Sequence, residues 1–393
     1  TTMAFVRLLG MLVKDKSIGK QIVPIVPDES RTFGMEGMFR QLGIFSQVGQ
    51  LYTPQDADQL MYYKEDKTGQ ILQEGINEAG GMADWIAAAT AYANHGVAMI
   101  PFYIYYSMFG FQRIGDLAWA AGDLRARGFL VGGTAGRTTL NGEGLQHQDG
   151  HSHLQAAMIP NCVSYDPTFA YELAVIVQHG MERMYKKQED VFYYLTVMNE
   201  NYTHPAMPKG AEEGIIKGMY KFSSIKGKSK AKVQLLGGGT ILREVIAAAE
   251  LLARDFDISS DVWSVTSFNE LRRDGIDCER WNMLHPEAKA RTSYVEQCLD
   301  SKTPVVAATD YIRAYPDQIR SYVKAPYKTL GTDGFGRSDF RKKLRQFFEV
   351  DRYYVAVAAL KALADEGTIE ASVVSKAIKQ YQINPDKPNP VTV

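Results

Sequence analysis

The chain has 393 residues, of which 45% are hydrophobic and 23% are charged, a balance typical of folded globular proteins and not of disordered chains. Its 44 Lys and Arg residues against 45 Asp and Glu residues give a net charge of -1, so no overall field attracts nucleic acid or an anionic membrane. The length exceeds that of one ordinary domain, and two α/β domains are expected.

Cysteine usage and hydropathy indicate the compartment. The chain carries three cysteines, Cys162, Cys278 and Cys298, which are widely spaced and form no CxxC motif. An odd number at such spacing argues against a disulfide framework and against a zinc site, so we expect reduced thiols in the cytoplasm. The most apolar run, residues 97–111, contains several tyrosines and a proline and is too short to cross a bilayer.

Residues 1–205 are predicted to form the first domain. Helical spacing over 2–16 is followed by a buried strand at 21–26, which ends at Asp28 and Glu29. Carboxylates at the carboxyl end of a strand lie where open α/β sheets bind their ligands.

The rest of this domain predicts one long loop and an α/β alternation. Residues 47–68 are polar and show no clear period, which favours a long loop of the kind that often serves function. Helices are predicted at 80–93, 109–125 and 169–185, and strands at 97–105, 128–131, 162–165 and 191–198. Strands that alternate with helices form a mainly parallel sheet flanked by helices on both faces.

Residues 206–232 are predicted to link this domain to a second one at 233–393. The linker is rich in glycine and lysine, and a solvated connector is favoured over a site for a polyanion. The second domain is predicted to have strands at 233–236, 262–266, 304–308 and 327–331 and helices at 241–253, 342–348, 353–365 and 371–381. Its first three elements form a βαβ unit.

A polar cluster precedes the middle of the chain. His147, Asp149, His151 and His153 alternate along one short segment, and Glu143 adds a carboxylate to it. Three interpretations stay open: a metal site, a polar catalytic pocket, or a network of hydrogen bonds and helix caps. Histidine beside carboxylate is the pairing that proton transfer near neutral pH requires.

Glu74 and Glu78 lie four residues apart. Either both belong to a solvated face, or one of them is buried and held protonated by its surroundings.

Six longer runs resemble one known family. Residues 28–41, 70–78, 100–112 and 138–147 are similar to the pyrimidine-binding domain of the homodimeric pyruvate dehydrogenase components, which depend on thiamin diphosphate. Residues 277–282 (Asp-Cys-Glu-Arg-Trp-Asn) and 331–338 (Gly-Thr-Asp-Gly-Phe-Gly-Arg-Ser) resemble the C-terminal domain of the transketolase superfamily. The resemblance covers nearly the whole chain.

The resemblance implies a role for each matched site residue. Glu78 would hydrogen-bond the ring nitrogen of the cofactor's aminopyrimidine, and Phe109 would stack on that ring. Tyr106 and His147 would handle protons and developing charge on the substrate oxygen. The remaining matches are Asp28 at the cofactor and Glu29 and Glu143 among the catalytic groups.

The resemblance also implies an activity and partners. The expected reaction is oxidative decarboxylation of pyruvate, with reductive acetylation of the lipoyl group of a dihydrolipoyl acetyltransferase component. Thiamin diphosphate would supply the electron sink, with Mg²⁺ at its diphosphate. A cytoplasmic homodimer is expected, with neither a nucleic acid nor a membrane partner.

One departure from the family pattern concerns the diphosphate. Family members hold it through Mg²⁺ with a Gly-Asp-Gly motif and a later asparagine, whereas leucine follows both Gly115-Asp116 and Gly122-Asp123 here. No metal ligand is therefore assigned. The Mg²⁺ ligands are expected on an upstream domain, and this chain alone is expected to be inactive.

Three alternatives remain. The chain could be the beta-type subunit of a two-chain 2-oxo acid dehydrogenase, which carries the same two domains. It could be a non-catalytic scaffold, although the joint presence of Glu78, Phe109 and His147 speaks against that. A metal-dependent hydrolase would rest on the histidine cluster alone.

Overall fold

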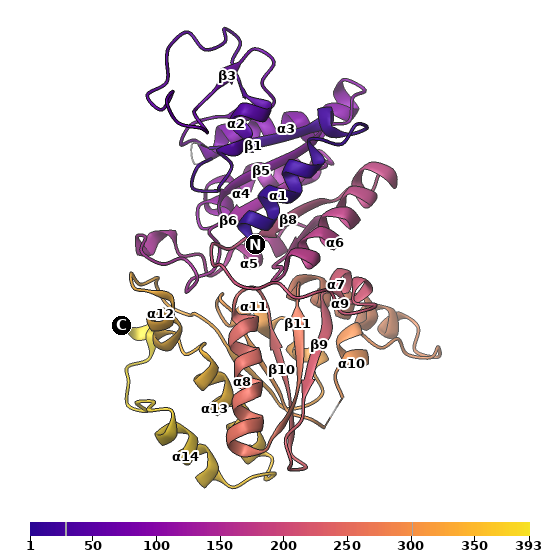
Figure 1. The fold of residues 1–393 in the computed structure, drawn as a ribbon. Helices are drawn as coiled ribbons and strands as arrows, with labels where there is room; N and C mark the ends of the chain where they lie inside the picture. Colours follow the sequence, from indigo (N-terminus) through magenta and orange to yellow (C-terminus); the bar gives the residue numbers. More distant parts are fainter. Residues whose placement is uncertain (28–29, 301) are drawn as a thin grey trace. The chain divides into compact units, whose positions relative to one another are not determined.

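The computed structural model describes residues 1–27, 30–300 and 302–393, in which strands and helices alternate as the sequence predicts (Figure 1). The chain divides into two units. Unit 1 comprises residues 1–135, 155–165 and 173–201, and unit 2 comprises residues 136–154, 166–172 and 202–393. Each unit contains a mainly parallel sheet flanked by helices, so the predicted fold class is confirmed.

Unit 1 is built on a six-stranded sheet of order β4-β1-β5-β6-β8-β7, in which every pair is parallel. The strands are β1 (Ile22–Val26), β4 (Leu72–Gln73), β5 (Ile100–Tyr106), β6 (Phe129–Gly133), β7 (Cys162–Tyr165) and β8 (Phe192–Thr196). The helices of this half of the chain are α1 (Thr2–Leu12), α2 (Gly37–Leu42), α3 (Glu78–Asn94), α4 (Gly110–Asp123), α5 (Ser152–Ala157) and α6 (Ala170–Met181).

A small parallel pair, β2 (Ile44–Phe45) and β3 (Glu65–Asp66), stands outside that sheet. Residues 46–64 between the two strands are all described and form no helix or strand, in agreement with most of the loop predicted at 47–68, whose end contains β3.

Aromatic packing fixes α3 to the sheet of unit 1. Trp85 is fully buried, and its Nε1 donates a hydrogen bond of 3.1 Å to the carbonyl oxygen of Phe129 on β6. The ring of Tyr103 on β5 lies so close to α3 that a Cβ added at Gly81 would meet it at 2.7 Å. Buried aromatic side chains of this size contribute strongly to core stability, so the start of α3 is held in a fixed place.

Unit 2 is built on a five-stranded sheet of order β13-β12-β10-β11-β9. Its strands are β9 (Met219–Ile225), β10 (Lys232–Gly237), β11 (Ser259–Val265), β12 (Val305–Ala308) and β13 (Tyr327–Leu330), and only β9 runs antiparallel to its neighbour among these. The helices are α7 (Glu212–Lys217), α8 (Ile241–Phe256), α9 (Phe268–Leu284), α10 (Tyr294–Cys298), α11 (Ala314–Asp317), α12 (Arg341–Phe347), α13 (Arg352–Asp365) and α14 (Ala371–Gln380).

Helix α8 packs on α13, and both cover the sheet of unit 2 (Figure 1). Their facing side chains form an apolar core around Val245, Leu252 and Leu360.

The segment 206–232, predicted as a linker, contains ordered structure. It holds α7 and then β9, which pairs with β11 as the edge strand of the sheet. Edge strands carry polar and charged side chains on one face, and lysines are a common way to protect such an edge. Of the lysines that suggested a connector, Lys221 lies on this edge strand, whereas Lys226, Lys228 and Lys230 follow it and Lys232 begins β10.

Helix α9 was not predicted, although its start has a sequence signal. Ser267 caps the helix by accepting a hydrogen bond from the backbone N–H of Glu270 at 3.0 Å. Ser followed by Glu three residues later is typical of a capping box, which marks a helix start. The helix itself is polar along most of its length, so apolar periodicity did not reveal it.

Two glycines on α4 offer a matched test of how this helix packs in unit 1. A methyl group at Gly110 would collide with the buried ring of Tyr105, whereas one at Gly115 would meet nothing within 4 Å. We expect Gly110→Ala to lower the free energy of unfolding by about 1–3 kcal/mol through overpacking. Gly115→Ala should raise it by about 0.5–1 kcal/mol, because alanine favours a helix interior. Urea unfolding of both variants checks this, and equal effects would contradict the assigned packing.

Candidate active site

Glu78 begins α3 and is largely buried, with its side chain 11% exposed. The Nη1 atom of Arg113 lies 2.6 Å from Oε1 of Glu78. The side chain of Asn77 caps the same helix by accepting a hydrogen bond from the N–H of Gly80 at 3.1 Å. A carboxylate in the first helical turn is further stabilised by the positive end of the helix dipole.

An aromatic group adjoins this carboxylate. The guanidinium of Arg113 lies 4.4 Å from the ring centre of Phe109, so the same cation contacts both Glu78 and the ring. The rings of Phe109 and Tyr106 meet edge to face at 6.0 Å, and Phe33 contacts Tyr106 at 5.4 Å. Both Phe109 and Tyr106 are partly exposed.

These groups fit a flat, nitrogen-containing ring. Oε2 of Glu78 accepts no hydrogen bond from the residues that the structure describes, whereas Oε1 is held by Arg113. A largely buried carboxylate oxygen beside a partly exposed aromatic ring can bond a ring nitrogen while the ring stacks. The side chains that the resemblance assigned to the aminopyrimidine, Glu78 and Phe109, therefore lie in one cluster.

Tyr103 on β5 contacts the backbone of Glu78. Its hydroxyl donates a hydrogen bond of 3.2 Å to the backbone oxygen of Glu78. Burial raises the pKa of Tyr103, and the nearby charges of Glu78, Asp84 and Glu74 act in the same direction. The phenol is therefore neutral at physiological pH and serves as a donor.

Glu143 and His147 belong to unit 2. They lie on the stretch 141–147, in which every residue is at least partly exposed, between the buried segments 131–140 and 148–150. The backbone oxygen of Glu143 accepts a hydrogen bond from Ser338 at 3.2 Å. The predicted site residues that the structure describes fall into two groups: Glu78, Tyr106 and Phe109 in unit 1, and Glu143 and His147 in unit 2.

Asp28 and Glu29, predicted at the cofactor and among the catalytic groups, lie outside the described residues.

The histidine cluster has a structural explanation. Oδ1 of Asp149 accepts hydrogen bonds from the N–H groups of His151 and Ser152 at 2.9 and 3.0 Å, so Asp149 caps the helical turn that follows. His153 is fully buried between the rings of Tyr311 and Tyr315, each at 4.9 Å. Burial lowers the pKa of His153 to about 4, against the charge of Asp149. This agrees with the capping interpretation.

Neither a metal-binding cluster nor a membrane-spanning helix is found among the described residues. Within residues 1–27, 30–300 and 302–393, no group of three or more His, Cys, Asp and Glu side chains is arranged to hold a metal ion. Across the described helices, none combines the length and the apolarity that crossing a bilayer requires.

Arg113, which contacts both Glu78 and Phe109, was not among the residues predicted from the sequence. It lies four residues after Phe109, a spacing that brings two side chains to the same face of a helix. The signal was therefore the i, i+4 relation within the predicted helix 109–125. The sequence could not reveal that Glu78, which lies on another helix, contacts Arg113 on that face.

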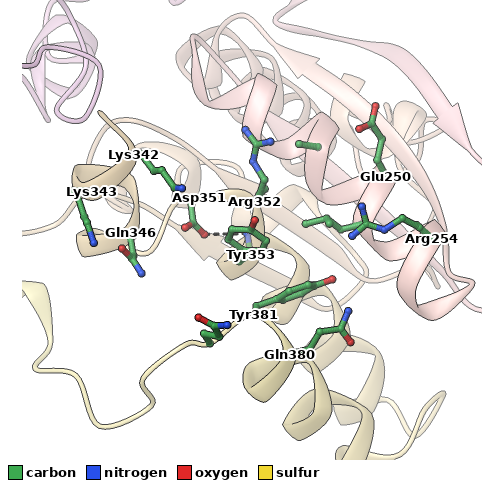
Figure 2. A pocket seen from close by; sticks show the side chains of 13 residues that line it. Glu250, Arg254, Lys342, Lys343, Gln346, Asp351, Arg352, Tyr353, Gln380 and Tyr381 are labelled. Carbon is green, nitrogen blue, oxygen red and sulfur yellow. Dashed lines mark hydrogen bonds between the residues drawn. The ribbon is translucent and has the colours of Figure 1, made fainter. Parts of the chain in front are cut away.

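A pocket of about 680 Å³ lies among α8, α12, α13 and α14 (Figure 2). Lys342 and Lys343 lie on one side of it and Arg254 on the other. The arginine charges are already compensated, since Arg254 pairs with Asp255 at 2.6 Å and Arg352 with Glu244 at 2.8 Å. None of the predicted site residues that the structure describes lines this pocket, so its size alone assigns it no role in the chemistry.

Comparison with known families divides the chain in two. Residues 1–205 match the model of the pyruvate dehydrogenase E1 component middle domain. Residues 218–351 match the transketolase-like C-terminal domain.

Individual relatives carry the same names. The chain is 68% identical over its whole length to the pyruvate dehydrogenase E1 component of Pseudomonas aeruginosa and covers 45% of that protein. It is 63% identical to the corresponding protein of Escherichia coli K12, with 99% of this chain and 44% of that protein covered. The chain thus spans about half the length of these relatives.

Solved structures support the fold. The transketolase of Campylobacter jejuni superposes with a TM-score of 0.65 over 92% of this chain and 46% of that chain, at 16% sequence identity.

A second carboxylate pair near the site predicts a pH effect. Asp84 on α3 faces Glu74, and burial together with the charge of Glu74 raises the pKa of Asp84 from 3.8 to about 6. The folded state then binds this proton more tightly than the unfolded chain, so stability falls as pH rises through that window. Asp84→Asn should raise the free energy of unfolding by up to about 1 kcal/mol above the window.

Urea unfolding at several pH values measures this difference. It should shrink as the pH falls below about 6 and vanish below the ordinary aspartate pKa of 3.8, where Asp84 is protonated in both the folded and the unfolded chain. Asp123→Asn, at the exposed end of α4, is the matched control and should show no such trend. An Asp84→Asn gain that is independent of pH would contradict the pairing.

Proposed function

The chain belongs to the family of pyruvate dehydrogenase E1 components, and on that premise we propose that it forms the aminopyrimidine-binding part of an enzyme that decarboxylates pyruvate with thiamin diphosphate. The enzyme would pass the two-carbon unit to the lipoyl group of a dihydrolipoyl acetyltransferase component. We propose that it acts in the cytoplasm as a homodimer, the commonest arrangement among soluble oligomers.

The observation that carries this proposal is the cluster of Glu78, Arg113 and Phe109. Arg113 holds one oxygen of the buried carboxylate at 2.6 Å and covers the aromatic ring at 4.4 Å. This leaves the other carboxylate oxygen as the acceptor for a proton on a ring nitrogen. A heteroaromatic ring is thus recognised both by stacking and by a charge-assisted hydrogen bond.

When bound, thiamin diphosphate supplies the sink for the electron pair that remains after carbon dioxide leaves. Glu78 holds a proton at the ring nitrogen and so favours the basic form of the neighbouring exocyclic nitrogen. Arg113 orients the Glu78 carboxylate through its contact with Oε1. Tyr103 hydrogen-bonds the backbone oxygen of Glu78 and so helps to hold the start of α3, which carries the acceptor oxygen.

The other proposed catalytic groups act on the substrate. His147 and Tyr106 would move protons and stabilise negative charge at the oxygen of the 2-oxo acid. Glu143 would add a carboxyl group to the exposed stretch that carries His147. Asp28 and Glu29 are proposed at the cofactor and the substrate from the sequence resemblance alone.

Glu78→Gln tests the central assignment in a full-length enzyme that contains this chain. Glutamine keeps the shape but cannot share a proton with the ring nitrogen, so we expect kcat to fall about 100- to 10,000-fold. Glu74→Gln changes an exposed carboxylate nearby and should leave kcat close to normal. Carbon dioxide release measures turnover, and circular dichroism measures folding. A Glu78→Gln enzyme with near-normal kcat would refute the assignment.

A reconstitution tests the division of labour. Residues 1–393 carry no Gly-Asp-Gly motif for the diphosphate, so we propose that the Mg²⁺ ligands lie elsewhere in the enzyme. The chain alone, with thiamin diphosphate and Mg²⁺, should release no carbon dioxide from pyruvate, because a cofactor held at one end is not oriented for reaction. Adding the diphosphate-binding region should restore release. Steady turnover by the chain alone would show that the diphosphate site was misplaced.

A further inference from the structure

The 141–147 loop, which carries Glu143 and His147, emerges from a base that is entirely buried. Residues 131–140 before it and 148–150 after it are buried without exception, while no residue of the loop itself is. Such a loop has its two ends fixed and its middle presented to solvent. What fixes the ends therefore decides where Glu143 and His147 stand.

Asp310 holds the first end. It follows β12 and is fully buried, and its carboxylate accepts four hydrogen bonds from Thr138 and Thr139. Oδ1 accepts from the backbone N–H and the hydroxyl of Thr138 at 2.8 and 2.6 Å. Oδ2 accepts from the same two groups of Thr139 at 3.1 and 2.6 Å.

The backbone of Asp310 takes part as well. Its carbonyl oxygen accepts a hydrogen bond from the N–H of Arg137 at 3.1 Å. Three consecutive residues, 137–139, are thus bonded to one aspartate that lies more than 170 residues further along the chain.

Neighbouring arginines reinforce this contact. Nε of Arg341 donates to the carbonyl oxygen of Thr139 at 2.7 Å, and Nη1 of Arg137 donates to that of Thr332, also at 2.7 Å. Burial raises the pKa of Asp310, while the positive charge of Arg345 and the bonds from both threonines act against this. Donors thus converge on both oxygens of the Asp310 carboxyl group.

Gln148 holds the second end. Its Nε2 donates to the carbonyl oxygen of Leu140 at 3.0 Å, which ties the end of the loop to its beginning. Its Oε1 accepts from the N–H of Arg337 at 2.8 Å.

We propose that Asp310 is a positioning residue for His147, acting through Thr138 and Thr139, and that the C-terminal part of the chain takes part in catalysis by setting the place of this loop. This inference rests on the proposed function of His147. The physical reason is that a catalytic group displaced by a fraction of an ångström loses most of its effect, whereas substrate binding elsewhere in the site is retained.

Asp310→Asn in the full-length enzyme tests the proposal. The amide keeps the size of the side chain but has one oxygen, so it cannot accept all four bonds. We expect kcat to fall about 10- to 100-fold. The KM for pyruvate should change by less than about twofold, because uniform binding is retained. Asp317→Asn, the same substitution at a partly exposed ion pair with Arg320, is the control and should leave both constants unchanged.

A double-mutant cycle with His147→Ala separates the two hypotheses. If Asp310 acts through His147, Asp310→Asn should cost less than about twofold once His147 is already alanine. If instead the fold losses in kcat of the two single variants multiply in the double variant, the positioning role is overturned and the proposed function stays intact. If His147→Ala itself leaves kcat unchanged, the proposed site has failed instead.

Hydrogen exchange supplies a readout independent of turnover. Amides 138–148 should lose protection in Asp310→Asn, while those of β10 and α8 keep theirs. Should Asp310→Asn fail to fold, Thr139→Val removes one donor to the same carboxylate and should give a smaller effect of the same kind. Normal kcat and normal protection of the loop in that variant would overturn the proposal.

Discussion

Burial of the Glu78 carboxylate is the constraint on which unit 1 depends. An ionised carboxyl group removed from water costs several kcal/mol unless charge and hydrogen bonds compensate it. Here Arg113 and the N-terminus of α3 do so, which requires α3 and α4 to start close together. Trp85 and Tyr103 lock α3 onto the sheet, so aromatic packing far from any ligand determines where the carboxylate lies.

Unit 2 treats its buried carboxylate in the opposite way. Both oxygens of Asp310 are occupied by neighbouring donors, whereas Oε2 of Glu78 has no hydrogen-bond donor among the described residues. A saturated carboxylate holds structure in place, and one with spare acceptor capacity can bind or exchange a proton. Asp310 is thus suited to hold structure in place, and Glu78 is suited to bind a ligand.

The α/β alternation was readable from the sequence because buried strands are short apolar runs and helices repeat every third or fourth residue. Elements with mixed faces were not: the polar helix α9 and the edge strand β9 both escaped. Glu78 and Phe109 were named from the resemblance, and the structure places them in one cluster through Arg113. Arg113 and Asp310 act across long separations, which no local spacing reveals.

The bond between Thr138 and Asp310 spans 172 residues, and this has a consequence for synthesis of the chain. A ribosome adds about 5–20 residues each second, so roughly 10–30 s pass between the appearance of the threonines and that of their acceptor. During that time Thr138 and Thr139 lack the carboxylate that accepts their hydrogen bonds in the folded chain. Residues 138 and 139 can therefore reach their folded arrangement only after the last third of the chain has been made.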